Sequence, residues 1–375
     1  MSPLAPPPPQ GSDDPRQWVK PAVRALGLYT LPPRTAQVKV DQNENPWELP
    51  EAFKQEVLRR MGAQPWGRYP EFNPRGLLEA LARHAGWRAD GVLAGNGSNE
   101  LISVLLQATV GEGVAVTLPQ PTFTLYASMV KTLGGRVVEV PLDAATLRFD
   151  LPALLATQER EGARLLILCS PNNPTGSHLD EAALRRVLQS WRGLVVVDEA
   201  YQEFAGWSAV PLLAEHPRLV VLRTFSKAMA LAGLRVGYLL ARPELTAELD
   251  KVRLPYNLNR FSCLAAELAL ERWDELLRPT VERLIAERAR LSAAIDALPG
   301  FAPWPSAANF LLVRAAWPPG EVLAALRERG VLARDVSRYP LLSSCFRVSV
   351  GTPAENEAVV EGLRAFARAR GEEGA

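Results

Sequence analysis

The chain has 375 residues, of which 47% are hydrophobic and 22% charged, and its formal net charge is +1. The length predicts about two domains, and the near-neutral charge gives no reason to expect nucleic acid or an anionic membrane as a partner. The opening residues, MSPLAPPPPQGSDDP, lack the basic start and apolar stretch of a secretory signal, and the apolar runs are shorter than the ~18 residues of a membrane span. We therefore expect a cytoplasmic protein.

Cysteine and histidine are sparse, with three residues of each type. They show neither the regular cysteine spacing of a disulfide framework nor the spacing of zinc ligands. We expect no metal site.

Five short apolar runs predict a mainly parallel β-sheet. They are VAVTL (114–118), RVVEV (136–140), LLILC (165–169), LVVVD (194–198) and LVVLR (219–223). Such runs, rich in branched residues, are typical of strands buried on both faces. The helical spacing between them indicates βα units, so we predict an α/β domain.

The chain after residue 240 predicts a second, smaller α+β domain. Residues 265–297 carry the apolar stripe of long helices. NFLLV (309–313) and FRVSV (346–350) predict strands around another helix near 319–329. The predicted divisions are a disordered Pro-rich tail over 1–20, an N-terminal arm that forms part of the small domain over 21–62, a large cofactor-binding domain over 63–265, and a small domain over 266–372.

The segment TFSKAMALAGLRVGY (224–238) follows a strand directly and so lies at the sheet edge where open α/β folds bind ligands. The hydroxyls of Thr224 and Ser226 and the guanidinium of Arg235 suit a dianionic phosphate. Lys227 is then free to act as an imine-forming amine, if burial and nearby positive charge lower its pKa. The alternative, a solvated loop lysine, is disfavoured by the hydroxyls and small residues around it.

Asp198 ends the run LVVVD, where an unpaired carboxylate is costly and needs a cationic partner. The protonated ring nitrogen of pyridoxal 5′-phosphate (PLP) is such a partner. Tyr201, three residues later, is placed to hydrogen-bond the phenolic oxygen of the same ring. A helix N-cap is one alternative for Asp198. A Walker-type metal carboxylate is another, but it would require a GxxxxGK[ST] loop that the chain lacks.

Three further loops complete the pattern. CSPNNPTG places Asn173 in a rigid turn after a strand, and AGNGSNELI places Ser98 at the start of an apolar helix, where phosphate binds well. LPQPTFTLY offers Phe123 for stacking on a ring. An ordinary Asn-Pro turn, a Gly-rich turn and a core aromatic are the respective alternatives.

Nine blocks in order resemble the histidinol-phosphate aminotransferase family, class II aminotransferases among the fold-type I PLP enzymes. The blocks are VDQNENPW, RYPEFN, GNGSNE, PTFTLY, SPNNPTG, VVVDEAYQEF, TFSKAMALAGLRVGY, ANFLLVR and FRVSVGT. The resemblance implies a large domain with a mainly parallel seven-stranded sheet flanked by helices, plus a smaller α+β domain. It also implies PLP as the cofactor.

The resemblance implies a role for each matching position. Lys227 would carry PLP as a Schiff base and shuttle a proton, Asp198 would pair the ring nitrogen, and Tyr201 and Asn173 would contact the ring oxygen. Phe123 would stack on the ring. The implied phosphate ligands are Gly97, Ser98, Asn99, Thr224, Ser226, Arg235 and Tyr69 of the partner subunit. The last of these implies a homodimer with shared sites. The implied substrate-side residues are Tyr29, Asn45, Asn309, Arg334 and Arg347.

The family reaction exchanges an amino group between L-histidinol phosphate and 2-oxoglutarate, in histidine biosynthesis, with ping-pong kinetics. Histidinol phosphate has no α-carboxylate, so its phosphate is expected to use the arginines that bind the glutamate carboxylates. Trp47 and Glu48 after NENP, and the block GVLARDVSRY, depart from the commoner family wording near the substrate side. An aromatic amino acid aminotransferase and a threonine-phosphate decarboxylase therefore stay open as alternatives.

Two other classes are less consistent with the sequence. Aminotransferase-like effector-binding modules occur fused to winged-helix domains, but only 28 residues precede Tyr29. The intact lysine block also indicates catalysis. A dinucleotide-binding oxidoreductase would require a full GxGxxG fingerprint, which the Gly-rich turn does not provide.

Overall fold

The computed structural model describes residues 14–27 and 36–372. Most of the predicted tail, and the predicted substrate residue Tyr29, lie outside the described residues. The described part of the N-terminal region forms the short helices η1 (Pro15–Trp18) and α1 (Pro21–Arg24).

The large sheet has seven strands in the order β2-β8-β7-β6-β5-β3-β4. They are β2 (Val92–Gly95), β3 (Ala115–Gln120), β4 (Arg136–Pro141), β5 (Leu165–Cys169), β6 (Leu194–Asp198), β7 (Leu219–Thr224) and β8 (Gly237–Leu240). All neighbours pair in parallel except β8, which is antiparallel to both β2 and β7. The predicted mainly parallel, seven-stranded sheet is confirmed.

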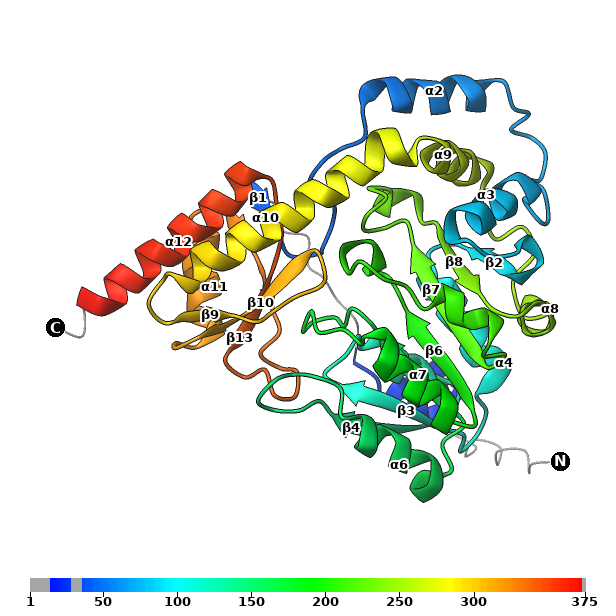
Figure 1. Cartoon of the computed structure of the whole chain (residues 1–375), viewed down its shortest axis with the longest axis horizontal. Helices are drawn as coiled ribbons and strands as arrows, with labels where there is room; N and C mark the ends of the chain where they lie inside the picture. The colour runs from blue at the N-terminus through cyan, green and yellow to red at the C-terminus, as the bar shows by residue number, and fades with distance from the viewer. Residues whose placement is uncertain (1–13, 28–35, 373–375) are drawn as a thin grey trace.

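Side-chain alternation along the strands gives the sheet two buried faces, each covered by helices (Figure 1). Leu166 and Leu168 of β5 pack in the core under one layer, and Leu165 and Ile167 pack in the core under the other. The first layer contains α3 (Arg75–Ala85), α6 (Leu151–Glu161), α7 (Glu181–Ser190) and α9 (Arg260–Glu271). The second contains α4 (Ser98–Thr109), α5 (Leu125–Thr132) and α8 (Pro243–Asp250).

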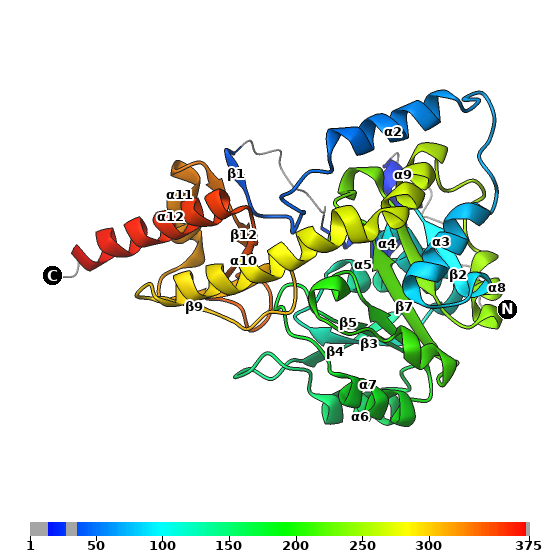
Figure 2. The same ribbon diagram turned by 45° about the horizontal axis from the view of Figure 1, so that its top comes forward.

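A smaller α+β unit follows, as predicted. Its antiparallel sheet has the order β12-β13-β10-β9. The strands are β9 (Phe301–Pro303), β10 (Phe310–Ala315), β12 (Arg334–Asp335) and β13 (Cys345–Ser349), and the helices are α10 (Arg278–Asp296), α11 (Pro319–Glu328) and α12 (Pro353–Glu372). Helix α10 extends from the large unit to the small one (Figure 2).

The helical stretch predicted over 265–297 is divided. A π-helical turn, η6 (Trp273–Leu277), separates α9 from α10. The short 3-10 helices are η2 (Ala89–Gly91), η3 (Gln202–Phe204), η4 (Val210–Ala214) and η5 (Ala232–Leu234). Within residues 14–27 and 36–372, no helix is long and apolar enough to cross a membrane.

The N-terminal segment contacts both units. Strand β1 (Val38–Lys39) pairs in parallel with β11 (Val331–Leu332) of the small unit. Helix α2 (Glu51–Gly62) packs on α9 of the large unit. Residues 40–50 connect β1 to α2 and pass the carboxyl edge of the large sheet, where the Gln42 carbonyl accepts a hydrogen bond from Lys227. The domain boundaries given in the sequence analysis stay a prediction.

Packing in the centre of the sheet makes a first prediction. Leu222 of β7 is fully buried, so Leu222→Ala removes apolar contacts and leaves a cavity. We expect the free energy of unfolding to fall by about 2–5 kcal/mol in chemical denaturation. Leu58→Ala, at a half-exposed position on α2, is the control and should change it little. Equal effects at the two positions would contradict this account of the core.

Candidate active site

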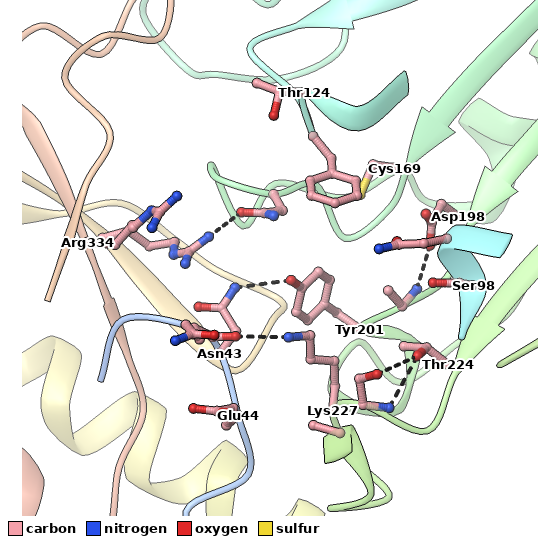
Figure 3. Close-up of a pocket in the computed structure, with 18 of the residues that line it drawn as sticks. Asn43, Glu44, Ser98, Thr124, Cys169, Asp198, Tyr201, Thr224, Lys227 and Arg334 are labelled. Atoms are coloured by element: carbon pink, nitrogen blue, oxygen red, sulfur yellow. Dashed lines mark hydrogen bonds between the residues drawn. The ribbon is translucent and has the colours of Figure 1, made fainter. Parts of the chain in front are cut away.

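A cavity of about 390 Å³ lies at the carboxyl edge of the large sheet, facing the small unit. Strands β5, β6 and β7 end side by side there, since Cys169 is in register with Asp198 and Asp198 with Leu222. The cavity collects most of the predicted site residues: Ser98, Asn99, Phe123, Asn173, Asp198, Tyr201, Thr224, Ser226, Lys227, Arg235, Arg334 and Arg347. Figure 3 shows side chains from both units meeting at this cavity, among them Asp198 and Lys227 of the large unit and Arg334 of the small one.

One end of the cavity is built to hold an anion. Ser98 begins the twelve-residue helix α4, whose free N–H groups attract negative charge. Arg235 donates to the Ser226 hydroxyl at 3.2 Å, and Thr224 donates to the same hydroxyl at 3.0 Å. Gly97 has φ 79°, and a Cβ there would overlap the Arg235 guanidinium, so only glycine allows this close approach.

The middle of the cavity holds an unpaired carboxylate. Asp198 is 3% exposed and accepts hydrogen bonds from the Tyr126 hydroxyl (2.6 Å) and the Ala200 N–H (3.1 Å). Burial raises the pKa of Asp198 to about 6, against these two hydrogen bonds. Among the described residues no Lys, Arg or His forms an ion pair with it. A protonated ring nitrogen would supply the missing charge.

Lys227 lies at the same cavity and donates from Nζ to the Gln42 carbonyl at 2.9 Å. Its Nζ is 5.8 Å from the centroid of the Tyr201 ring. Burial lowers the pKa of Lys227 to about 7, and the charges of Arg347 and Arg235 act in the same direction, against that of Glu44. A large part of Lys227 is therefore a neutral amine at neutral pH, as a nucleophile requires.

The far end of the cavity has two arginines. Arg334 of β12 and Arg347 of β13 are direct partners in the antiparallel register, so both reach the same region. Arg347 donates to Asn173 Oδ1 (2.5 Å) and to the Asp41 carbonyl (2.7 Å), and its guanidinium lies 5.3 Å from the Phe310 ring. Its buried Nε has no hydrogen-bond partner in the described chain. The pair offers open donors to a second anion.

Four predicted residues do not line this cavity in the single chain. Asn309 is buried and donates to the Asn43 carbonyl at 3.0 Å, and Asn45 donates to the Ala228 carbonyl at 3.2 Å beside a neighbouring hollow. Gly97 lies behind Arg235. Tyr69 is 77% exposed and stacks on Tyr256. Their roles at the site stay predictions.

Sequence reasoning missed two residues with direct contacts at the site. Tyr126 holds Asp198, and Asn43 donates to the Tyr201 hydroxyl at 3.0 Å. Both belong to blocks already singled out, PTFTLY and VDQNENPW. Each block contained a polar side chain to which the sequence analysis gave no role, and this could have pointed to Tyr126 and Asn43.

The anion cradle, unpaired carboxylate and neutral lysine match the phosphate, ring nitrogen and aldehyde of PLP, so the residues present fit that cofactor. Residues 35–363 match the family model "Aminotransferase class I and II". The chain belongs to the class I and II aminotransferase family. This membership confirms the predicted PLP-dependent transaminase.

Several named relatives of this aminotransferase belong to the same family. It is 37% identical to the histidinol-phosphate aminotransferase of Chlorobaculum tepidum, covering 92% of this chain and 99% of the relative. It is 42% identical to that of Methylibium petroleiphilum, covering 93% and 94%. The crystal structure of histidinol-phosphate aminotransferase from Sinorhizobium meliloti in complex with PLP superposes with a TM-score of 0.83 at 28% identity, covering 94% of this chain and 98% of that one.

The unpaired carboxylate makes a second prediction. Asp198→Asn removes the charge that the ring nitrogen needs, so PLP binding should weaken about a hundredfold or more. The same substitution should raise the free energy of unfolding of the cofactor-free protein at neutral pH, because it removes a buried charge. Because burial raises the pKa of Asp198 from 3.8 to about 6, this group destabilises the cofactor-free protein progressively as the pH rises through that interval. The variant should lose that pH dependence in denaturant titrations.

The matched control is Glu203→Gln, because burial also raises the pKa of Glu203, to about 7, but this carboxyl does not line the cavity. It should leave PLP affinity unchanged. Equal losses of affinity in the two variants would contradict the assignment of Asp198 to the ring nitrogen.

The lowered pKa of Lys227 makes a third prediction. PLP added to the cofactor-free protein should be captured at a rate that rises with pH through about 7 and then levels off, because only the neutral amine reacts. Stopped-flow absorbance measures this rate, and Lys227→Ala should abolish capture. A rate that keeps rising towards pH 10 would mean that Lys227 keeps an ordinary pKa.

Proposed function

We propose that this aminotransferase exchanges an amino group between L-histidinol phosphate and 2-oxoglutarate, forming imidazole acetol phosphate and L-glutamate in histidine biosynthesis. The observation that carries the substrate proposal is the pair Arg334 and Arg347, in register on adjacent strands at the far end of the cavity. The names of relatives that share 36–42% of the sequence over almost their whole length support it.

The arginine pair suits both substrates. A phosphate monoester and a carboxylate each accept parallel hydrogen bonds from a planar guanidinium. Histidinol phosphate brings one phosphate, and glutamate brings two carboxylates. Arg347 is anchored by Asn173 and the Asp41 carbonyl, and Arg334 is less buried beside it. We infer that Arg347 binds an anion of both substrates and that Arg334 adjusts to their different lengths.

Bound PLP would supply an aldehyde for the substrate amine and a protonated ring that accepts electrons from the substrate Cα. Asp198 would hold the ring nitrogen protonated, while Tyr126 keeps the carboxylate in place. Ser98, Ser226 and Arg235 would bind the phosphate. Once the substrate amine has displaced Lys227, the Lys227 Nζ would take a proton from the substrate Cα. It would then deliver this proton to the C4′ carbon of the cofactor.

The active unit is proposed to be a homodimer in the cytoplasm. Tyr69 is exposed and stacks on Tyr256, and Trp66, Phe72 and Leu254 of the same two loops are also exposed apolar side chains. Clustered exposed aromatics are typical of an interface. In a dimer, the loop around Tyr69 would reach the phosphate end of the partner's cavity.

The substrate proposal makes a fourth prediction. Arg347→Ala should lower kcat/KM about ten- to a hundredfold in both half-reactions, because each loses a charged hydrogen bond. Arg334→Ala should affect the two half-reactions unequally. The measurement is single-turnover conversion of the bound cofactor by histidinol phosphate and, in reverse, by 2-oxoglutarate.

Arg338→Ala is the matched control, because Arg338 is an exposed neighbour that does not line the cavity. The same assay with phenylalanine, tyrosine and threonine phosphate separates the alternatives. A tenfold preference for phenylalanine in kcat/KM would favour an aromatic aminotransferase. Release of carbon dioxide without 2-oxoglutarate would favour a decarboxylase.

A further inference from the structure

Residues 41–43 cross the edge of the cavity and contact three groups of the proposed mechanism. Arg347 donates to the Asp41 carbonyl, Lys227 donates to the Gln42 carbonyl, and the Asn43 side chain donates to the Tyr201 hydroxyl. The first two contacts use backbone oxygens that any residue supplies. The third depends on the identity of Asn43, which is 1% exposed.

The position of Asn43 is fixed from the small unit. Its backbone N–H donates to the Ser349 hydroxyl at 2.8 Å, and Asn309 donates to its carbonyl at 3.0 Å. Its backbone has φ 55°, in the left-handed region that Asn tolerates better than most residues. The side chain therefore has a defined starting point.

The orientation of the Asn43 amide follows from Ser349. The Ser349 hydroxyl accepts from the Asn43 backbone, and its own proton has one acceptor in the described part of the chain, Asn43 Oδ1 at 3.0 Å. Turning the amide over would leave that buried proton without an acceptor, which is costly. The Oδ1 atom therefore faces Ser349, and Nδ2 faces Tyr201.

The amide orientation determines what Tyr201 can do. Because Asn43 Nδ2 donates at 3.0 Å, the Tyr201 oxygen is the acceptor in this contact. Its own proton has no acceptor among the described residues. Tyr201 lines the cavity beside Lys227, and Figure 3 shows its hydroxyl pointing towards the Asn43 side chain.

We propose that Asn43 is a positioning residue that fills the acceptor side of the Tyr201 hydroxyl and thereby directs its proton into the cavity, towards the ring oxygen of PLP. The inference rests on the proposed function, since that oxygen receives the proton. Ser349 acts one step further back, through the amide of Asn43. Burial raises the pKa of Tyr201 above its usual value, so this hydroxyl stays protonated and remains a donor at neutral pH.

The test is a double-mutant cycle between Asn43→Asp and Tyr201→Phe on the PLP-loaded protein. The variant carboxylate keeps the size of Asn43 and its contact with Ser349, but it accepts from Tyr201 and turns that proton away from the cavity. The ring oxygen loses a hydrogen bond that stabilises its ionised form. The pH midpoint of the visible absorbance should therefore rise by about one unit, and PLP affinity should fall about tenfold.

The two backgrounds distinguish positioning from charge. In Tyr201→Phe the same substitution should shift the midpoint much less, because no hydroxyl is left to turn. Asn43→Gly, which suits the left-handed backbone and adds no charge, should shift the midpoint upward by a smaller amount only when Tyr201 is present. Equal shifts with and without the Tyr201 hydroxyl, or no shift with it, would overturn the inference. Failure of the unsubstituted protein to bind PLP would instead overturn the proposed function.

Discussion

The unpaired carboxylate of Asp198 is the constraint that organises this site. Asp198 is 3% exposed at the end of a central strand, so burial disfavours its ionised form unless a cation lies beside it. Lys227 has the complementary problem, because burial and two arginines disfavour its charged form. The charged form of each group is disfavoured by burial, and one ligand with a cationic ring and an electrophilic carbon would satisfy both.

The charges around these two groups are arranged by the fold. The N-terminus of α4 and Arg235 provide positive potential at one end of the cavity, and Arg334 and Arg347 provide it at the other. The first end belongs to the large sheet and the second to the small one. We therefore propose that the substrate binds where the two units meet, between one group of cationic side chains that would hold the cofactor phosphate and another that would hold the substrate anion. Residues 41–43 connect the two sides through Arg347, Lys227 and Tyr201.

Sequence patterns predicted the parts of this structure that depend on local order along the chain. Strands buried in a parallel sheet need uninterrupted runs of branched apolar residues, so the sequence predicted β3 to β7. Asp198 and Thr224 could then be placed at the ends of two of these strands. Contacts between segments far apart in the sequence could not be predicted from local patterns. Tyr126 and Asp198 are 72 residues apart, and Asn43 and Tyr201 are 158 apart. The antiparallel direction of β8 and the π-helical turn before α10 likewise depend on tertiary packing rather than on periodicity.

The central claim is that Lys227, and no other lysine, bonds covalently to PLP. The most direct measurement is borohydride reduction of the PLP-loaded protein, followed by proteolysis and mass spectrometry of the peptides. We expect one modified peptide, with the added mass of the reduced cofactor on Lys227. Modification at Lys39 or at exposed lysines with Lys227 unmodified, or no added mass on any peptide, would contradict it.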